Sequence, residues 1–204
     1  MNWLEEWFTR SKNLVLHPEK FYEDVDAKKN YSYPIKFAVT SALLLSLVVF
    51  VVQEFQLAVG LDPMHAPQIT GLESLVYLIM VGILGGTVGL LLQAGFIHVF
   101  VVLLGFRGYQ KTTEAISYPT AINTFFGWIP IVNFFALIYT IYAEIKGIES
   151  FHGMSTKKAA VSVILGFVFL VLMVVILFSV IFILLNLEAV APAVGVEGPL
   201  EAFI

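Results

Sequence analysis

Long apolar stretches separated by short polar segments dominate the pattern of this chain. Four apolar blocks stand out, at residues 35–52, 72–104, 115–143 and 159–187. Their lengths suit the roughly 20 residues that an α-helix needs to cross about 30 Å of hydrocarbon. Buried helices of a soluble bundle would keep a polar face, yet residues 161–185 offer only two serines as polar side chains. The pattern therefore predicts membrane-spanning helices.

The composition supports an all-α, polytopic integral membrane bundle. Hydrophobic residues make up 59% of the 204 residues and charged residues only 13%, whereas soluble domains carry about 25% charged residues. The mean hydropathy is +0.89. The N-terminal segment is polar and amphipathic rather than an apolar signal peptide, so the first block is expected to be a retained anchor. The chain has no cysteine, which excludes disulfides, thiolate metal sites and cysteine lipidation.

Positive charge is confined to three segments of the chain. The 11 lysines and arginines lie within residues 10–36, 105–113 and 144–158. Loops rich in lysine and arginine stay on the cytoplasmic side, so these segments and the N-terminus are predicted to be cytoplasmic, and the C-terminus outside. The expected organisation is a cytoplasmic amphipathic segment (1–33), a transmembrane domain (34–187) and a short acidic and apolar extracytoplasmic tail (188–204).

The block 115–143 must enter and leave the membrane on the same side if the segments that flank it are both cytoplasmic. It carries a break at Gly127–Pro130, where proline removes a helical donor. We therefore expect a re-entrant helical hairpin, and about five membrane segments in all: three full spans plus this hairpin. The competing topology splits 72–104 at Gly85 and Gly86 into two spans and makes 115–143 a single span.

The N-terminal segment predicts an amphipathic helix followed by a short second helix. Trp3, Trp7 and Phe8 recur at helical spacing beside charged residues. Such a helix either lies in the membrane interface or packs on the cytoplasmic ends of the spans, and the sequence leaves both open. The second helix is expected to begin at Pro18, because proline suits a first helical turn.

Small and polar residues within the blocks are the candidates for packing and binding. The glycines of the second block allow close helix packing or form a hinge: Gly82, Gly85, Gly86 and Gly89. The polar residues either hydrogen-bond between helices or line a groove for a lipid headgroup or small solute: Gln93, His98, Ser117, Tyr118, Asn123, Thr124 and Asn133. Only Glu54 is expected as a charged residue inside a span, which argues against an ion-coupled pump.

Catalytic and nucleic-acid-binding patterns are missing from the sequence. It contains no nucleophile elbow, no zinc-protease motif and no phosphate-binding glycine loop. The histidines show no metal-ligand spacing, so no catalytic residue, metal or cofactor is expected. The formal net charge is −4, and no basic patch suggests nucleic-acid binding. The expectation is a protein that is not an enzyme, with the lipid bilayer, other membrane proteins or a second copy of itself as its partners.

Three stretches resemble the Yip domain family of membrane proteins, which are named for their interaction with Ypt/Rab GTPases. These stretches are His17–Glu23 with Tyr33-Pro34, Ala115–Pro119 with Gly127–Val132, and Gly147–Ala159. The resemblance implies five predicted spans with a cytoplasmic N-terminus and an outer C-terminus. The chain is similar to a small prokaryotic member, which places it in a cytoplasmic or plasma membrane.

The resemblance also bears on function. Eukaryotic members organise vesicle traffic and bind small GTPases. This chain lacks their long cytoplasmic N-terminal region and their Asp-Leu-Tyr-Gly-Pro stretch, so GTPase binding is not carried over. Two functions are therefore considered. The first is a non-enzymatic membrane scaffold or adaptor, and the second is passage of lipid or small solutes along a polar groove in the 115–143 hairpin.

Cysteine labelling distinguishes the two topologies, because the chain has no cysteine of its own. We expect a reagent that does not cross the membrane to label Tyr109→Cys from the cytoplasmic side. Labelling of this position from the outside would contradict the hairpin topology and select the split helix.

Overall fold

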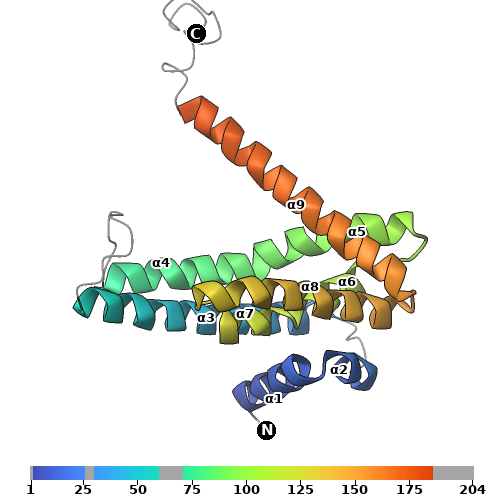
Figure 1. Cartoon of the computed structure of the whole chain (residues 1–204), viewed down its shortest axis with the longest axis horizontal. Coiled ribbons are helices and arrows are strands. Elements are labelled where there is room, and N and C mark those ends of the chain that lie inside the picture. Colours follow the sequence, from blue (N-terminus) through green and yellow to red (C-terminus); the bar gives the residue numbers. More distant parts are fainter. Residues whose placement is uncertain (1, 26–29, 60–70, 186–204) are drawn as a thin grey trace, which may run out of the picture. The chain divides into compact units, whose positions relative to one another are not determined.

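The computed structural model of the chain describes residues 2–25, 30–59 and 71–185, and the regular elements within these ranges are all helices. The elements are α1 (Trp3–Leu16), α2 (Pro18–Asp24), α3 (Ser32–Ala58), α4 (Gly71–Leu84), the π-helical η1 (Gly85–Gly89), α5 (Leu90–Leu103), α6 (Tyr109–Ser117), α7 (Thr120–Phe126), α8 (Pro130–His152) and α9 (Thr156–Leu185) (Figure 1). The chain forms two units, residues 1–167 and 168–204, which are described separately.

Four of the described helical stretches are long and apolar enough to cross a membrane. They are Ser32–Ala58, Gly71–Leu103, Pro130–His152 and Thr156–Leu185, with 27, 33, 23 and 30 residues. Each exceeds the roughly 20 residues that the hydrocarbon core requires. The predicted all-α, polytopic membrane bundle is therefore confirmed.

The stretch Gly71–Leu103 is one helix that runs through η1 without a break. The topology that splits this stretch at Gly85 and Gly86 is not adopted. No proline interrupts the backbone hydrogen bonds there, and the helix only changes from an α-helix to a wider π-helix at η1. The Thr87 hydroxyl donates to the Ile83 carbonyl oxygen at 2.6 Å, which satisfies its own polar group within the helix.

The packing of α4 and η1 on α3 depends on two of the glycines. A Cβ atom on Gly82 would lie 2.8 Å from the Ser46 hydroxyl, and one on Gly86 would lie 2.7 Å from the Val39 Cα. Helices in membranes approach this closely only where side chains are small. Ser46 also donates to the Leu78 carbonyl at 2.9 Å, which joins the two helices at the same level.

The segment 109–152 folds back on itself, with α8 packed against both α6 and α7 (Figure 1). The turn between the arms contains Gly127, whose N–H donates to the Asn123 carbonyl at 2.7 Å. It also contains Ile129, whose backbone is extended. Pro130 is the first residue of α8, a position that requires no backbone donor. This arrangement has the form of the expected hairpin.

The second arm of the hairpin is longer than expected. Helix α8 runs to His152 and so includes the first part of segment 144–158, which we predicted to be cytoplasmic. The charged side chains of this part find partners on other helices: Gln93 bonds Glu144 at 2.8 Å, and Glu19 pairs with Lys146 at 2.9 Å. These partners come from distant parts of the chain, so the sequence alone does not reveal them.

Helix α1 packs on the bundle with one of its faces. Trp7 and Leu14 are buried, and the indole N–H groups of Trp3 and Trp7 donate to the Thr40 and Ser41 hydroxyls of α3, both at 2.9 Å. A neighbouring flank remains apolar and exposed, with Leu4 57% and Phe8 53% accessible. The structure therefore places α1 against the spans, while this flank stays free to contact lipid.

The described part of the second unit, residues 168–185, is a single continuous helix. Its large apolar side chains are nearly all exposed, which in a membrane means exposure to lipid tails. Ser179 donates to the Val175 carbonyl at 2.8 Å, so its hydroxyl is satisfied within the helix.

Gly147 provides a test of the packing between α2, α6 and α8. A Cβ atom there would lie 2.8 Å from the Tyr22 ring and 2.9 Å from the Ala115 carbonyl. We expect Gly147→Ala to lower the free energy of unfolding by about 1–3 kcal/mol, as overpacking does. The measurement is unfolding in detergent micelles.

Gly95→Ala is the matched control, since nothing lies within 4 Å of its added Cβ. It should be neutral or stabilise by up to about 1 kcal/mol, the difference in helix propensity. Equal effects of the two substitutions would contradict the close packing at Gly147.

Candidate functional site: buried polar side chains around α6

Helix α6 is where polar side chains gather inside the bundle. Its residues Thr112, Thr113, Glu114 and Ser117 are fully buried, and the helix packs against α3, α5 and α8. Burial of a polar group is unfavourable unless it is hydrogen-bonded. Thr113 and Ser117 donate to carbonyls of their own helix, whereas Thr112 contacts residues of α5 and α8.

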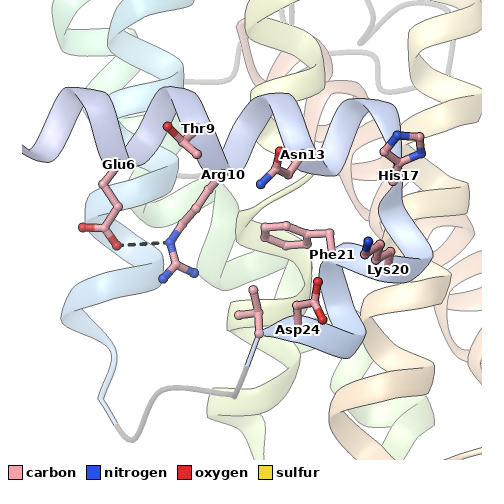
Figure 2. A pocket seen from close by; sticks show the side chains of 9 residues that line it. Glu6, Thr9, Arg10, Asn13, His17, Lys20, Phe21 and Asp24 are labelled. Atoms are coloured by element: carbon pink, nitrogen blue, oxygen red, sulfur yellow. Dashed lines mark hydrogen bonds and ion pairs between the residues drawn. The ribbon is translucent and has the colours of Figure 1, made fainter. Parts of the chain in front are cut away.

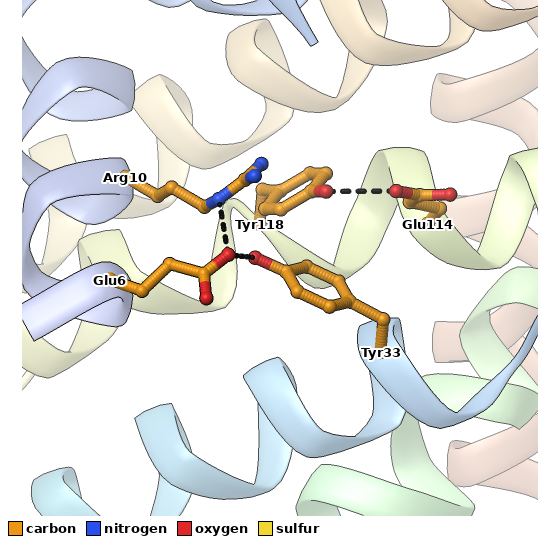
Figure 3. Close-up of polar contacts among 5 residues, drawn as sticks. All are labelled: Glu6, Arg10, Tyr33, Glu114 and Tyr118. Carbon is orange, nitrogen blue, oxygen red and sulfur yellow. Dashed lines mark hydrogen bonds and ion pairs between the residues drawn. The ribbon is translucent and has the colours of Figure 1, made fainter. Parts of the chain in front are cut away.

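The first group, which we name the tyrosine cluster, consists of Glu6, Arg10, Tyr33, Glu114 and Tyr118 (Figure 3). The Tyr118 hydroxyl donates to Glu114 Oε1 at 2.8 Å. Glu6 Oε1 accepts from the Tyr33 hydroxyl at 2.8 Å and from Arg10 Nε at 3.1 Å. The Arg10 guanidinium also lies 5.2 Å from the centre of the Tyr33 ring, a favourable cation–π distance. The cluster joins α1, α3 and α6.

The second group is a pair formed by Gln93 of α5 and Glu144 of α8. Gln93 Nε2 donates to Glu144 Oε1 at 2.8 Å. Glu144 is only 2% exposed, and its Oε2 has no hydrogen-bond partner among the described residues. We had placed Glu144 in the predicted cytoplasmic segment 144–158, and it lies on the helix that forms the third candidate span.

The third group, the histidine pair, joins His98 and His152 through a shared hydroxyl. Thr112 Oγ1 lies 2.8 Å from His98 Nδ1 and 3.0 Å from His152 Nε2. A hydroxyl has one hydrogen to donate and two lone pairs, so at most one of the rings accepts from it and at least one donates to it. This pair could not be predicted from the sequence, because 54 positions separate the two histidines (152 − 98).

A metal centre is not assembled by these residues. The described part of the chain holds no group of three or more histidine, cysteine, aspartate or glutamate side chains suited to a metal ion. The histidine pair supplies two nitrogens, and the hydroxyl between them is not among the usual protein ligands of zinc.

The polar residues that we singled out in the 115–143 block are placed in different surroundings. Ser117, Tyr118 and Thr124 are buried, and Thr124 donates to the Ser41 carbonyl of α3 at 2.8 Å. Ser117 donates to the Glu114 carbonyl at 2.8 Å. Asn123 is half-buried and Asn133 is exposed. The buried members thus bond to neighbouring backbone and carboxyl oxygens of the protein.

Helix α2 packs against α8 and bonds to both α6 and α8. The Tyr22 hydroxyl donates to the Ala115 carbonyl at 2.8 Å, and burial raises the pKa of Tyr22 well above its usual range, so it remains a neutral donor. Glu19 accepts from Lys146 at 2.9 Å and from the Tyr142 hydroxyl at 3.0 Å. The hydrogen bond from Lys146 is the main reason that the pKa of Glu19 is lowered.

These features define a polytopic α-helical membrane protein whose buried polar groups join its N-terminal helices to the spans. The family model of the Yip1 domain matches residues 12–186. The chain therefore belongs to the Yip1 domain family, and the resemblance that the sequence suggested is confirmed. No match was found among curated proteins or solved structures.

A double-mutant cycle tests the pair of Gln93 and Glu144. We expect Gln93→Leu to lower the free energy of unfolding by about 1–3 kcal/mol, because a buried carboxyl group loses its donor. Gln93→Leu combined with Glu144→Leu should recover part of this loss, since no polar group is then left unpaired. Unfolding in detergent micelles measures both. Strictly additive effects would contradict the coupling.

Proposed function

We propose that this chain is a non-enzymatic membrane scaffold that self-associates through an exposed pair of glycines, Gly85 and Gly89. The observation that carries the proposal is the division of the four glycines between two helix faces. Gly82 and Gly86 pack on α3, whereas an added Cβ on Gly85 or Gly89 would meet nothing within 4 Å. Both of the latter are exposed.

The geometry of this face suits a second transmembrane helix. Gly85 and Gly89 are four residues apart, the spacing that lets two helix backbones approach closely in a membrane. The exposed side chains of Val81, Val88 and Leu92 lie near the pair along the helix, and they would pack on the partner around the glycines. A second copy of the chain offers the same face, which a symmetric dimer requires.

The distribution of charge supports one orientation of such a scaffold. The described lysines and arginines lie near α1, α2, the α5–α6 connection and the region where α8 meets α9. By the positive-inside rule these parts face the cytoplasm. The scaffold would then present α1 and α2 to cytoplasmic partners while its glycine pair joins copies within the bilayer.

Passage of lipid or solute along the 115–143 hairpin has less support. Ser117, Tyr118 and Thr124 are buried and donate to oxygens of the protein itself. Ser117 and Tyr118 bond within their own turn of the chain, and Thr124 bonds to α3; a hydrogen bond between helices of a membrane bundle contributes about 0.6 kcal/mol. These side chains are thus occupied by partners within the protein, and the Thr124 bond holds α7 against α3.

Substitution of the exposed glycines tests the proposed self-association. We expect Gly85→Leu and Gly89→Leu to weaken dimerisation about tenfold, because an isobutyl group keeps the two backbones apart. Subunit counting by single-molecule photobleaching in liposomes at low protein-to-lipid ratio measures this. Gly86→Leu is unsuitable, since it would strike Val39 within the chain.

Val76→Leu is the matched control on the same helix. Val76 is exposed and precedes Gly85 by nine residues, which places it about half a turn away around the helix. It should leave dimerisation unchanged. A wild-type protein that stays monomeric, or glycine variants that dimerise as the wild type does, would refute the proposal.

A further inference from the structure

A pocket of about 490 Å³ lies in the angle between α1 and α2 (Figure 2). The angle exists because α1 ends at His17 and Pro18 begins α2 in a new direction. Arg10 and Asn13 border it from α1, and Lys20, Phe21 and Asp24 border it from α2. Its size falls within the range of small-molecule sites in proteins.

The pocket contains unpaired charges of both signs. Lys20 and Asp24, one helical turn apart on α2, are exposed and make no ion pair or hydrogen bond with another described residue. The Glu6 carboxylate, by contrast, already binds Arg10 and Tyr33. A ligand in the pocket therefore meets one free ammonium group and one free carboxylate.

The Arg10 side chain adds a second positive group that is held in place. Its Nε bonds Glu6 at 3.1 Å, and its guanidinium lies over the Tyr33 ring. A guanidinium fixed in this way loses little freedom when it meets a phosphate. Asn13 supplies an uncharged amide donor beside it. Arg10, Asn13 and Lys20 together suit a phosphate oxygen, and Asp24 suits a cation beside it.

The pocket also lies at the level of the membrane interface. Glu6 and Arg10 on its wall contact Tyr33, the second residue of the spanning helix α3. Tyrosine and tryptophan are enriched at this level, and Trp3 packs edge-on against Tyr33 at 5.5 Å. The polar headgroups of lipids occupy the same layer.

From these observations we infer that the α1–α2 pocket binds the zwitterionic phosphoethanolamine headgroup of a membrane lipid. The phosphate lies against Arg10, Asn13 and Lys20, and the primary ammonium group donates to the Asp24 carboxylate. Phosphatidylcholine fits less well, because its quaternary ammonium has no N–H to donate. Phosphatidylglycerol fits less well, because it has no cation for Asp24. This site is independent of the exposed glycine pair.

Native mass spectrometry of the full chain in detergent, titrated with each of these three lipids, tests the inference. We expect phosphatidylethanolamine to bind most tightly. Lys20→Ala should weaken both phosphatidylethanolamine and phosphatidylglycerol about tenfold, the effect of about 1.4 kcal/mol. Asp24→Asn should remove the preference for phosphatidylethanolamine over phosphatidylglycerol. Both residues are exposed and unpaired with described residues, so both variants should fold.

Matched controls come from the same two helices. Lys12→Ala and Glu23→Gln change exposed charges of α1 and α2 that do not line the pocket, and both should bind as the wild type does. Equal losses in Lys12→Ala and Lys20→Ala, or no preference for phosphatidylethanolamine in the wild type, would overturn the inference. Soluble phosphoethanolamine is the last control. If it competes for the pocket at the same concentration as the lipid, the conclusion that the ligand is a membrane lipid is overturned.

Discussion

Burial of polar side chains between helices is the constraint on which the arrangement of this protein depends. Glu114 and Glu144 are both nearly inaccessible, and a buried carboxyl group is tolerated only where donors reach it. Tyr118 and Gln93 are those donors. The Gln93 bond fixes α8 against α5, whereas Tyr118 lies one turn beyond Glu114 and bonds it locally. Helix α6 is joined to α5 by the His98–Thr112 contact and by the bond from the Tyr109 hydroxyl to the Leu91 carbonyl. The tyrosine cluster extends the same requirement to α1.

The N-terminal helices are therefore connected to α3, α6 and α8 rather than forming a loose extension of the membrane domain. Tyr22, Glu19 and Trp7 each bond to a different spanning or hairpin element. The α1–α2 pocket owes its shape to this anchoring, since Arg10 is held by Glu6 and Tyr33. Proposed headgroup binding and proposed self-association thus use separate faces of one bundle, which allows the two to be tested apart.

Much of the fold could be predicted from hydrophobic pattern alone. The block 72–104 corresponds to the helix Gly71–Leu103 almost residue for residue, because a membrane requires a long uninterrupted apolar stretch. The break near Gly127 and Pro130 also coincides with the observed turn. The end of α8 could not be placed, since Glu144 and Lys146 look like a polar loop until their partners are known. The histidine pair could not be predicted either, because His98 and His152 come together only in the folded structure.

The sequence by itself determined that the chain is a polytopic helical membrane protein of the Yip1 domain family, because apolar length and local motifs are encoded by neighbouring residues. The tertiary structure alone decided which glycines are internal. Gly82 and Gly86 contact α3 while Gly85 and Gly89 remain open, and identical spacing cannot tell the two pairs apart. It also decided which charges are paired, because the partner of a charged side chain lies on another helix.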